Sequence, residues 1–411
     1  MRIFLVGGAV RDELLGAPVT DRDYVVVGAS AERLLSLGFR SVGKDFPVFL
    51  HPETGEEYAL ARTEKKTGPG YKGFAFDVSP EVTLESDLLR RDLTINAMAR
   101  TDRGELIDPY GGVRDLRLRM LRHISPAFGE DPLRVLRVAR FASVLSPYGF
   151  RVAPETLHLM EAMVHSGELD SLVPERVFLE LKKALQSISP RPFIEVLRSC
   201  GGLKVLFPEI DALFESQRNS INGVETDLGL RTLEVLDTVT QASVSPVTRF
   251  AALVHDLGRA QLDFCQWSDD AEVVMRGAES LMAIARRLPL PKEFLRLAKK
   301  VIRFHADVHR VHLAEPEGLL TLLERMDLFR QEWELEAILQ VCRADLQAGS
   351  GYATIEYPQA EILREALAVT KVICIEQIKS EGYDGPLDAQ RVHAQRLRQL
   401  LASPGQRQRV R

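Results

Sequence analysis

The chain has 411 residues, of which 45% are hydrophobic and 27% are charged, and its formal net charge is -5. This length exceeds that of one ordinary domain, and the globular composition excludes a peptide hormone or a disordered tail protein. The slightly acidic charge argues against a protein that coats nucleic acid over its whole surface, but it allows one basic face.

The four cysteines and the apolar runs limit the remaining classes. The cysteines form no C-x-x-C pair, so the sequence indicates neither a disulfide framework nor a thiolate zinc site. The longest apolar runs are too short to span a bilayer, and the N-terminus has no signal-peptide pattern. We therefore expect a cytoplasmic protein without membrane contact.

The first 112 or so residues predict a small α/β domain. Short runs rich in strand formers (IFLVGGAV, RDYVVVG, FPVFLH, EEYALART) alternate with helical patterns (RDELLG, SAERLLSLG). After Asp115 strand signals nearly vanish, and apolar residues recur at helical spacing through segments such as LRVLRVARFASVL and PERVFLELKKALQ. The rest of the chain is therefore predicted to be helical.

Two carboxylates precede the second predicted strand. If Asp21 and Asp23 both lie on that strand, their side chains share a face and can bind a hard cation such as Mg²⁺. Paired carboxylates suit a two-metal phosphoryl-transfer site. A D-x-D pattern alone is weak, because a turn or a cap explains it equally well.

Phosphate-binding features surround this pair. Residues 5–12 (LVGGAVRD) indicate a strand, a glycine turn and a helix start, in which Gly8 allows close backbone approach and Arg11 reaches a triphosphate. Farther on, Arg90 and Arg91 precede Asp92 and Asn96, a set suited to triphosphate and ribose.

A predicted helix after Pro132 carries arginines at every third position. Asp131 is expected to cap this helix, while Arg134, Arg137 and Arg140 form one cationic ridge. Such a ridge indicates an anion-binding surface.

These motifs, taken in order, resemble those of a known family. GGAVRD, the DRD before a strand, RRDLTINAM, DPYGGVRDL, EDPLRVLRVARFA and PERVFLELKKAL have the order and spacing seen in class II tRNA nucleotidyltransferases, in particular bacterial CCA-adding enzymes with an HD-type domain. The resemblance implies an α+β protein with a polymerase-beta-like head and a helical neck, body and tail. It also implies template-independent addition of CCA to tRNA from CTP and ATP with Mg²⁺.

The resemblance assigns roles to single positions. Asp21 and Asp23 resemble the metal-binding pair, and Asp131 with Arg134 resembles the pair that reads the incoming base. The remaining nucleotide-binding positions are Gly8, Arg11, Arg91, Asp92, Asn96, Arg137 and Arg140. Glu57 is a speculative third carboxylate. Thr63 to Ser79, with Gly68, Gly70 and Gly73, resembles a flexible loop used in switching from C to A, which favours full CCA addition.

A second motif departs from the family pattern. His255 and Asp256 lie in an apolar helix pattern, and with Asp345 they are the candidate ligands of a residual HD site for a divalent transition metal. His305 and His309 are the other surviving residues of a metal-binding type. Arg231 stands where the first histidine ligand is expected, and a guanidinium cannot bind a metal. Phosphohydrolase activity is therefore expected to be weak or lost.

Five segments are predicted: a head over residues 1–113, a neck over 114–150, a body over 151–225, a degenerate HD-like domain over 226–330 and a tail with an Arg-rich terminus over 331–411. The alternatives are a poly(A) polymerase of the same superfamily, or a cyclic phosphodiesterase or phosphatase acting through the HD-like part. A monomer and a homodimer are both compatible with the sequence.

Overall fold

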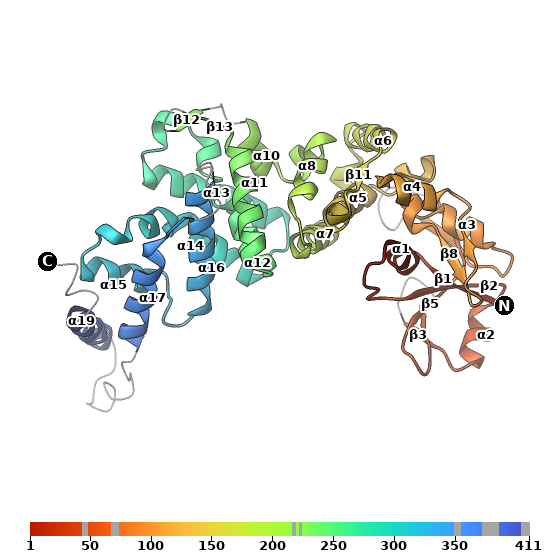
Figure 1. Ribbon diagram of the computed structural model, residues 1–411, viewed down its shortest axis with the longest axis horizontal. Helices are drawn as coiled ribbons and strands as arrows, with labels where there is room; N and C mark the ends of the chain where they lie inside the picture. The colour runs from red at the N-terminus through yellow and green to blue at the C-terminus, as the bar shows by residue number, and fades with distance from the viewer. Residues whose placement is uncertain are drawn as a thin grey trace. The chain divides into compact units, whose positions relative to one another are not determined.

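The computed structural model describes residues 1–42, 48–66, 74–215, 219–221, 224–348, 355–371 and 386–403. The chain divides into two compact units, Met1–Leu206 and Phe207–Arg411. The first unit contains a seven-stranded sheet with helices, and the described part of the second is helical apart from one strand pair (Figure 1). The predicted α+β class, with a small sheet-containing head, is confirmed.

The first unit begins with the sheet-containing part and continues into helices. Its elements are β1 (Arg2–Val6), α1 (Gly8–Leu15), β2 (Asp23–Val27), α2 (Ala31–Ser36), β3 (Arg40–Val42), β4 (Val48–Leu50), β5 (Glu57–Leu60), β6 (Thr63–Lys66), β7 (Phe74–Asp77), α3 (Leu84–Leu89), β8 (Ala99–Thr101), β9 (Leu106–Ile107), α4 (Gly112–Leu118), β10 (Met120–Leu121), α5 (Leu133–Leu145), β11 (Arg151–Val152), α6 (Pro154–His165), α7 (Pro174–Gln186), α8 (Arg191–Ser199) and α9 (Gly202–Leu206).

The central sheet has the strand order β3-β4-β5-β2-β1-β8-β9. β2 pairs with β1 in antiparallel and with β5 in parallel register, so that Asp23 lies opposite Val6 on one side and Glu57 on the other. The parallel pairing requires a crossover, and α2, β3 and β4 lie within it. Strand β2, which begins with Asp23, thus lies at the middle of the sheet.

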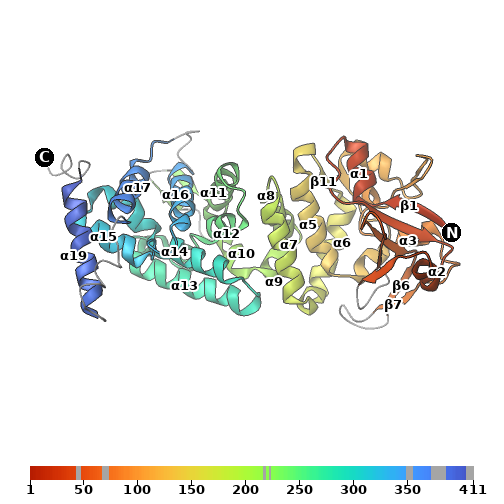
Figure 2. The same ribbon diagram turned by 90° about the horizontal axis from the view of Figure 1, so that it is seen from below.

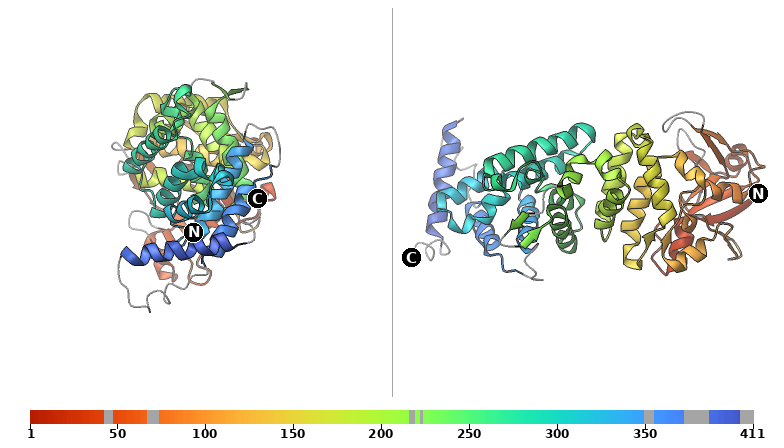
Figure 3. Two further views of the ribbon diagram at one scale, coloured as in Figure 1. Left: turned by 90° about the vertical axis from the view of Figure 1, so that its left-hand side faces the viewer. Right: turned by 90° about the horizontal axis from the view of Figure 1, so that it is seen from above.

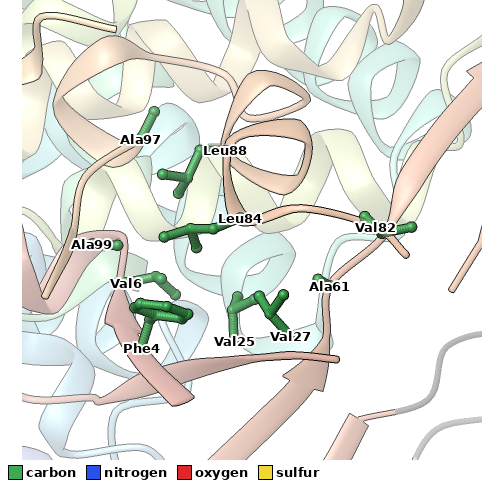
Figure 4. Packing of buried hydrophobic residues seen from close by; sticks show 10 residues of the cluster. All are labelled: Phe4, Val6, Val25, Val27, Ala61, Val82, Leu84, Leu88, Ala97 and Ala99. Atoms are coloured by element: carbon green, nitrogen blue, oxygen red, sulfur yellow. The ribbon is translucent and has the colours of Figure 1, made fainter. Parts of the chain in front are cut away.

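Strand alternation divides the head core into two clusters. Val25 and Val27 of β2 share a face with Phe4 and Val6 of β1 and pack against Leu84 and Leu88 of α3 (Figure 4). On the opposite face, Val26 joins a cluster that contains Leu34 of α2. Because the side chains of a strand point alternately to opposite faces, one valine run contributes to both clusters.

Helix α5 organises the helical part of the first unit. It packs against α7 and α8, as two views show (Figures 1 and 2). The hydroxyl of Ser143 accepts the backbone N–H of Phe193 at 2.9 Å and donates to the carbonyl of Pro190 at 3.2 Å, which ties the start of α8 to α5. One face of α5 is thereby fixed in this core, and its arginines point elsewhere.

The second unit is built of helices, with the two short strands at its start (Figure 3). Its elements are α10 (Pro208–Glu215), β12 (Asn219–Ile221), β13 (Val224–Thr226), α11 (Leu228–Ala242), α12 (Pro246–Val254), α13 (Asp270–Arg287), α14 (Lys292–His309), α15 (Pro316–Arg325), α16 (Trp333–Gln347), α17 (Pro358–Lys371) and α19 (Pro386–Ala402). No helix among the described residues combines the length and the apolar character that crossing a membrane requires.

The structure corrects two details of the sequence prediction. Four short strands follow Asp115, because β10 pairs with β11 and β12 pairs with β13. The described ends of the predicted flexible loop pair as β6 and β7, while Gly68, Gly70 and Gly73 lie outside the described residues. The five predicted segment boundaries stay predictions.

Candidate active site

The first unit contains a cavity of about 700 Å³ that gathers the polar motifs of its sequence. Its lining comprises Gly7, Gly8, Arg11, Asp21, Asp23, Arg62, Phe76, Arg90, Arg91, Asp92, Asn96, Asp131, Arg134, Arg137, Arg140, Phe141, Arg176 and Lys183. All eleven residues predicted for the metal-binding pair, the base-reading pair and the other nucleotide-binding positions are in this set. Segments up to 176 positions apart therefore meet at one site, since Gly7 and Lys183 both line it.

The acidic pair lies at one side of the cavity. Asp23 begins β2, whereas Asp21 lies in the loop before it, so the expectation that both residues share the strand was wrong. Both are exposed, and neither forms an ion pair within the described part of the chain. Although its side chain reaches solvent, partial desolvation by the surrounding cavity walls raises the pKa of Asp23, and Asp21 raises it further, while Arg91 lowers it. Two open carboxylates that repel each other fit a divalent cation.

Gly7 determines the shape of the turn between β1 and α1. Its φ of 72° lies in the left-handed region, and a Cβ atom there would approach Nη1 of Arg91 to 2.7 Å. Gly8, by contrast, has ordinary backbone geometry, and a Cβ atom there would be 3.5 Å from Arg11. Gly7 is therefore the position whose backbone demands glycine, and the close approach predicted at Gly8 stays a prediction.

A buried carboxylate that the sequence analysis did not identify holds two cations of the lining. Asp87 of α3 is fully buried and accepts from Nε of Arg90 at 3.0 Å and from Nη2 of Arg91 at 3.5 Å. Burial would raise the pKa of Asp87, but Arg90 and Arg91 lower it. Asp87 is thus a charged anchor behind the cavity wall.

A chain of hydrogen bonds links α1 to α5 across the cavity floor. Nη1 of Arg11 donates to Oδ1 of Asn96 at 2.8 Å, and Nδ2 of Asn96 donates to Asp92 at 3.0 Å. Asp92 also accepts from Nε of Arg137 at 2.7 Å. Burial would raise the pKa of Asp92, but Arg137 and Asn96 hold it well below its usual range. Asp92 therefore positions Arg137 directly and Arg11 through Asn96, while Asp12 also accepts from Nε of Arg11 at 2.8 Å.

The third arginine of α5 is anchored from α7. Nε of Arg140 donates to Glu180 at 2.5 Å, and Glu180 is buried. The ring of Phe141 lies beneath Arg11, Arg137 and Arg140, whose guanidinium carbons are 5.5, 5.7 and 4.2 Å from its centroid. The three arginines of the predicted ridge all line the cavity, and each guanidinium has a partner within the protein.

Asp131 and Arg134 lie where the cavity meets the start of α5. Oδ1 of Asp131 accepts the backbone N–H of Leu133, the first residue of α5, at 3.0 Å, although the N-cap of this helix is Pro132 and not Asp131 as predicted. Oδ2 of Asp131 is 3.8 Å from Arg176. Arg134 donates to the backbone carbonyls of Ala127 at 2.9 Å and Arg90 at 2.6 Å. Both side chains are thereby fixed in direction.

The lining is strongly cationic overall. It carries nine arginine and lysine side chains against four aspartates, so it suits a polyanion such as a triphosphate or an RNA end. Glu57 is exposed beside Asp23 in the next strand but is not part of the lining. Its role as a third carboxylate stays a prediction.

The second unit contains a separate buried group, called here the His–Asp cluster: His255, Asp256, His305, His309 and Asp345. Ligand atoms of His255, Asp256 and Asp345 lie within 4.8 Å of one another. Nε2 of His255 is 3.3 Å from Oδ1 of Asp345, and Nε2 of His309 is 3.0 Å from Oδ2. The residues of the predicted HD site are thus brought together.

Two arginines enter this cluster. Nη2 of Arg231 donates to Oδ1 of Asp345 at 2.5 Å, and Nη1 of Arg259 donates to Oδ1 of Asp256 at 2.6 Å. Burial would raise the pKa of Asp256, but Arg259 and His255 lower it to about 2. Arg231, the departure noted in the sequence, therefore contacts one of the expected metal ligands directly.

A mixed sheet with an open acidic pair beside a glycine turn defines a head of the nucleotidyltransferase class. A family model described as "Poly A polymerase head domain" matches residues 3–122, and one described as "Probable RNA and SrmB- binding site of polymerase A" matches residues 149–214. Both matches lie within the unit that holds the cavity, except for the last residues of the second.

Relatives that match nearly the whole chain identify the family to which it belongs within this class. The chain is 49% identical to the Multifunctional CCA protein of Nitrosococcus oceani over 97% of this chain and 98% of that protein. It is 51% identical to the one from Alkalilimnicola ehrlichii over 98% of this chain and 97% of that protein. The chain belongs to the family of multifunctional CCA proteins.

A solved structure agrees with this at the level of fold. The Bacillus stearothermophilus CCA-adding enzyme in complex with CTP matches with a TM-score of 0.63 and 24% identity, covering 96% of this chain and 87% of that one. The arrangement of head and helices is therefore the fold of CCA-adding enzymes.

Proposed function

We propose that this protein adds CCA to the 3′ end of tRNA, using CTP and ATP and releasing pyrophosphate, in the cytoplasm. The observation that carries the proposal is the cavity in which an open acidic pair faces nine cationic side chains. The near full-length relatives named Multifunctional CCA protein support it independently. A poly(A) polymerase is not favoured, because those relatives match nearly the whole chain.

We propose Mg²⁺ as the metal of the head, held by Asp21 and Asp23. Hard oxygen ligands without a competing cation suit this ion. Bound Mg²⁺ would favour ionisation of the attacking hydroxyl and neutralise charge on the phosphates. The chain's own residues do the positioning: Arg11, Arg91 and Arg137 orient the triphosphate.

The reaction is a nucleotidyl transfer. The 3′-hydroxyl of tRNA loses its proton and attacks the α-phosphate in line; the new O–P bond forms as the bond to the departing pyrophosphate breaks. The cationic lining stabilises the charge that collects on pyrophosphate. Catalysis at this site consists mainly of positioning and charge neutralisation.

Base choice is assigned to Asp131 and Arg134. A carboxylate accepts from the exocyclic amine of C or A, and an arginine donates to the adjacent ring acceptor, whereas U and G present the opposite pattern. A good bidentate pair supplies about 1–3 kcal/mol of discrimination. The fixed directions of both side chains support a protein edge that acts as the template.

The test uses tRNA that lacks its 3′ CCA, with Mg²⁺ and each labelled nucleotide alone and combined. We expect addition of two C and one A, and none from UTP or GTP. Asp23→Asn should abolish nucleotide incorporation while tRNA binding persists. Asp102→Asn, which changes an exposed aspartate of the same head, should leave incorporation unchanged. A long tail from ATP alone would refute CCA addition in favour of poly(A) synthesis.

For the second unit we propose that the His–Asp cluster binds a divalent transition metal only weakly and that phosphohydrolase activity is weak or lost. Imidazole and carboxylate ligands suit such an ion. Arg231 on Asp345 opposes it.

A further inference from the structure

The His–Asp cluster contains buried polar atoms that can receive a cation. Nδ1 of His255 lies 2.7 Å from the carbonyl of Ala252, and Nδ1 of His305 lies 3.0 Å from that of Val301. Because a carbonyl only accepts, both Nδ1 atoms carry the proton, and the Nε2 atom of a neutral ring keeps a lone pair.

Two acceptor atoms of the His–Asp cluster have no hydrogen-bond partner among the described residues. They are Nε2 of His305 and Oδ2 of Asp256, and both side chains are buried. A buried acceptor atom without a donor lowers the stability of the fold, so these two atoms favour a bound cation or another donor between them. His255 and Asp345 complete a set of nitrogen and oxygen atoms suited to a divalent transition metal.

Arg231 occupies one of these ligands. Its Nη2 atom lies 2.5 Å from Oδ1 of Asp345 and 2.9 Å from the backbone oxygen of the same residue. That carboxylate oxygen is the one nearest His255, at 3.3 Å, while His309 takes the other at 3.0 Å. An ion shared by His255 and Asp345 therefore has to displace the guanidinium.

The charges of the cluster lead to the same result. Arg231 neutralises Asp345, and Arg259 neutralises Asp256. With both pairs formed, the buried group is balanced, and a divalent ion would add two uncompensated positive charges. Release of Arg231 from Asp345 removes one of these opposing charges and frees the ligand atom at the same time.

We infer that Arg231 is an internal competitor for the metal: its guanidinium holds Asp345 in place of the ion, and its removal increases the metal affinity of the His–Asp cluster. This inference rests on the proposed weak metal binding and is independent of CCA addition. Arg231 acts on the metal site through Asp345 and does not bind the ion itself, so it is a positioning residue.

Arg259 provides a matched control. It is also a cation paired with a buried aspartate, but it contacts Oδ1 of Asp256 and leaves the unpartnered Oδ2 available. Replacing Arg259 removes a nearby charge without freeing a ligand atom. A difference between the two positions therefore separates competition for Asp345 from a general electrostatic effect.

The experiment titrates full-length protein with Co²⁺, followed by calorimetry and by the visible absorption of the ion. All variants carry Asp21→Ala and Asp23→Ala, so that the head contributes no site. We expect Arg231→Gln to bind Co²⁺ at least ten-fold more tightly than the parent and Arg259→Gln to change affinity less than three-fold. Adding His305→Ala to Arg231→Gln should remove the gain.

Two results would overturn the inference: no gain in Arg231→Gln, or an equal gain in Arg259→Gln. Circular dichroism checks folding; if Arg231→Gln is unfolded, the equally uncharged Arg231→Met takes its place, for which no gain in affinity is equally decisive. CCA addition is assayed in parallel on protein with an intact head. Absence of CCA addition from the unmodified protein would contradict the proposed nucleotidyl transfer and leave the Co²⁺ result interpretable.

Discussion

Replacing Asp92 with asparagine removes the charge that joins α1 to α5. Asp92 is 5% exposed and binds Arg137, Asn96 and the backbone N–H of Leu93. An asparagine keeps the shape and one acceptor oxygen but loses the ion pair. We therefore expect the cavity floor to lose order without loss of the fold.

The size of the effect follows from these contacts. Removing one partner of a buried ion pair costs about 3–5 kcal/mol. The side chain of Arg137 is 37% exposed and recovers part of this from water, so we expect about 2–3 kcal/mol lower stability. Since Arg11 depends on Asn96 and hence on Asp92, kcat/KM for both nucleotides should fall about ten- to hundred-fold, or about 1.4–2.7 kcal/mol.

The assay compares Asp92→Asn with Asp115→Asn. Asp115 is also buried and paired, with Thr94 at 2.7 Å and Arg122 at 3.0 Å, but it does not line the cavity. Thermal unfolding should show a loss of stability in both variants, whereas steady-state incorporation of CMP and AMP should fall only in Asp92→Asn. Equal kcat/KM losses in the two variants, or none in Asp92→Asn, would refute the positioning role.

Three further outcomes are expected in the first unit. Gly7→Ala should abolish incorporation and destabilise the protein by about 1–3 kcal/mol, since alanine is strained at this φ and clashes with Arg91; wild-type activity would contradict the close approach. Glu180→Gln should raise KM for nucleotide about ten-fold through Arg140, measured by steady-state kinetics, and an unchanged KM would count against the anchor. Because the pKa of Asp87 is lowered, its stabilising effect is present above the ordinary aspartate pKa of about 3.9 and is lost as pH falls below it. Unfolding temperatures between pH 3 and pH 7 should therefore drop less steeply at the acid end in Asp87→Asn, and parallel curves would exclude this contribution.

Residue type and local order were enough to predict the cavity residues. Asp21, Asp23 and Arg11 stand next to clear strand, turn and helix patterns, so their chemistry could be read before the fold was known. The same patterns predicted most elements of the head, because β-branched runs and helical spacing are local signals. The loop position of Asp21 was missed because strand ends depend on pairing with neighbours.

The ion pairs that hold charged side chains in the cavity and in the His–Asp cluster could not be predicted in this way. Glu180 lies in an ordinary helical pattern, and its partner Arg140 is 40 positions away. Arg231 was recognised as a departure, but its contact with Asp345 spans 114 positions. Such pairs form only when helices pack, and nothing in the local pattern distinguishes a buried acidic partner from a solvated one.

The same anchors explain how a chain with a net charge of -5 can contain a strongly cationic cavity. Asp87, Asp92 and Glu180 lie buried next to the cations they orient, so part of the acidic total is used inside the first unit. A carboxylate behind an arginine fixes the direction of its remaining donors, and those donors face the lining where a phosphate would compete for them. The net charge of the chain adds the charges of both members of each ion pair, so it does not indicate the cationic cavity. The cavity is recognised only when the buried carboxylates are considered separately from the arginines and lysine of the lining.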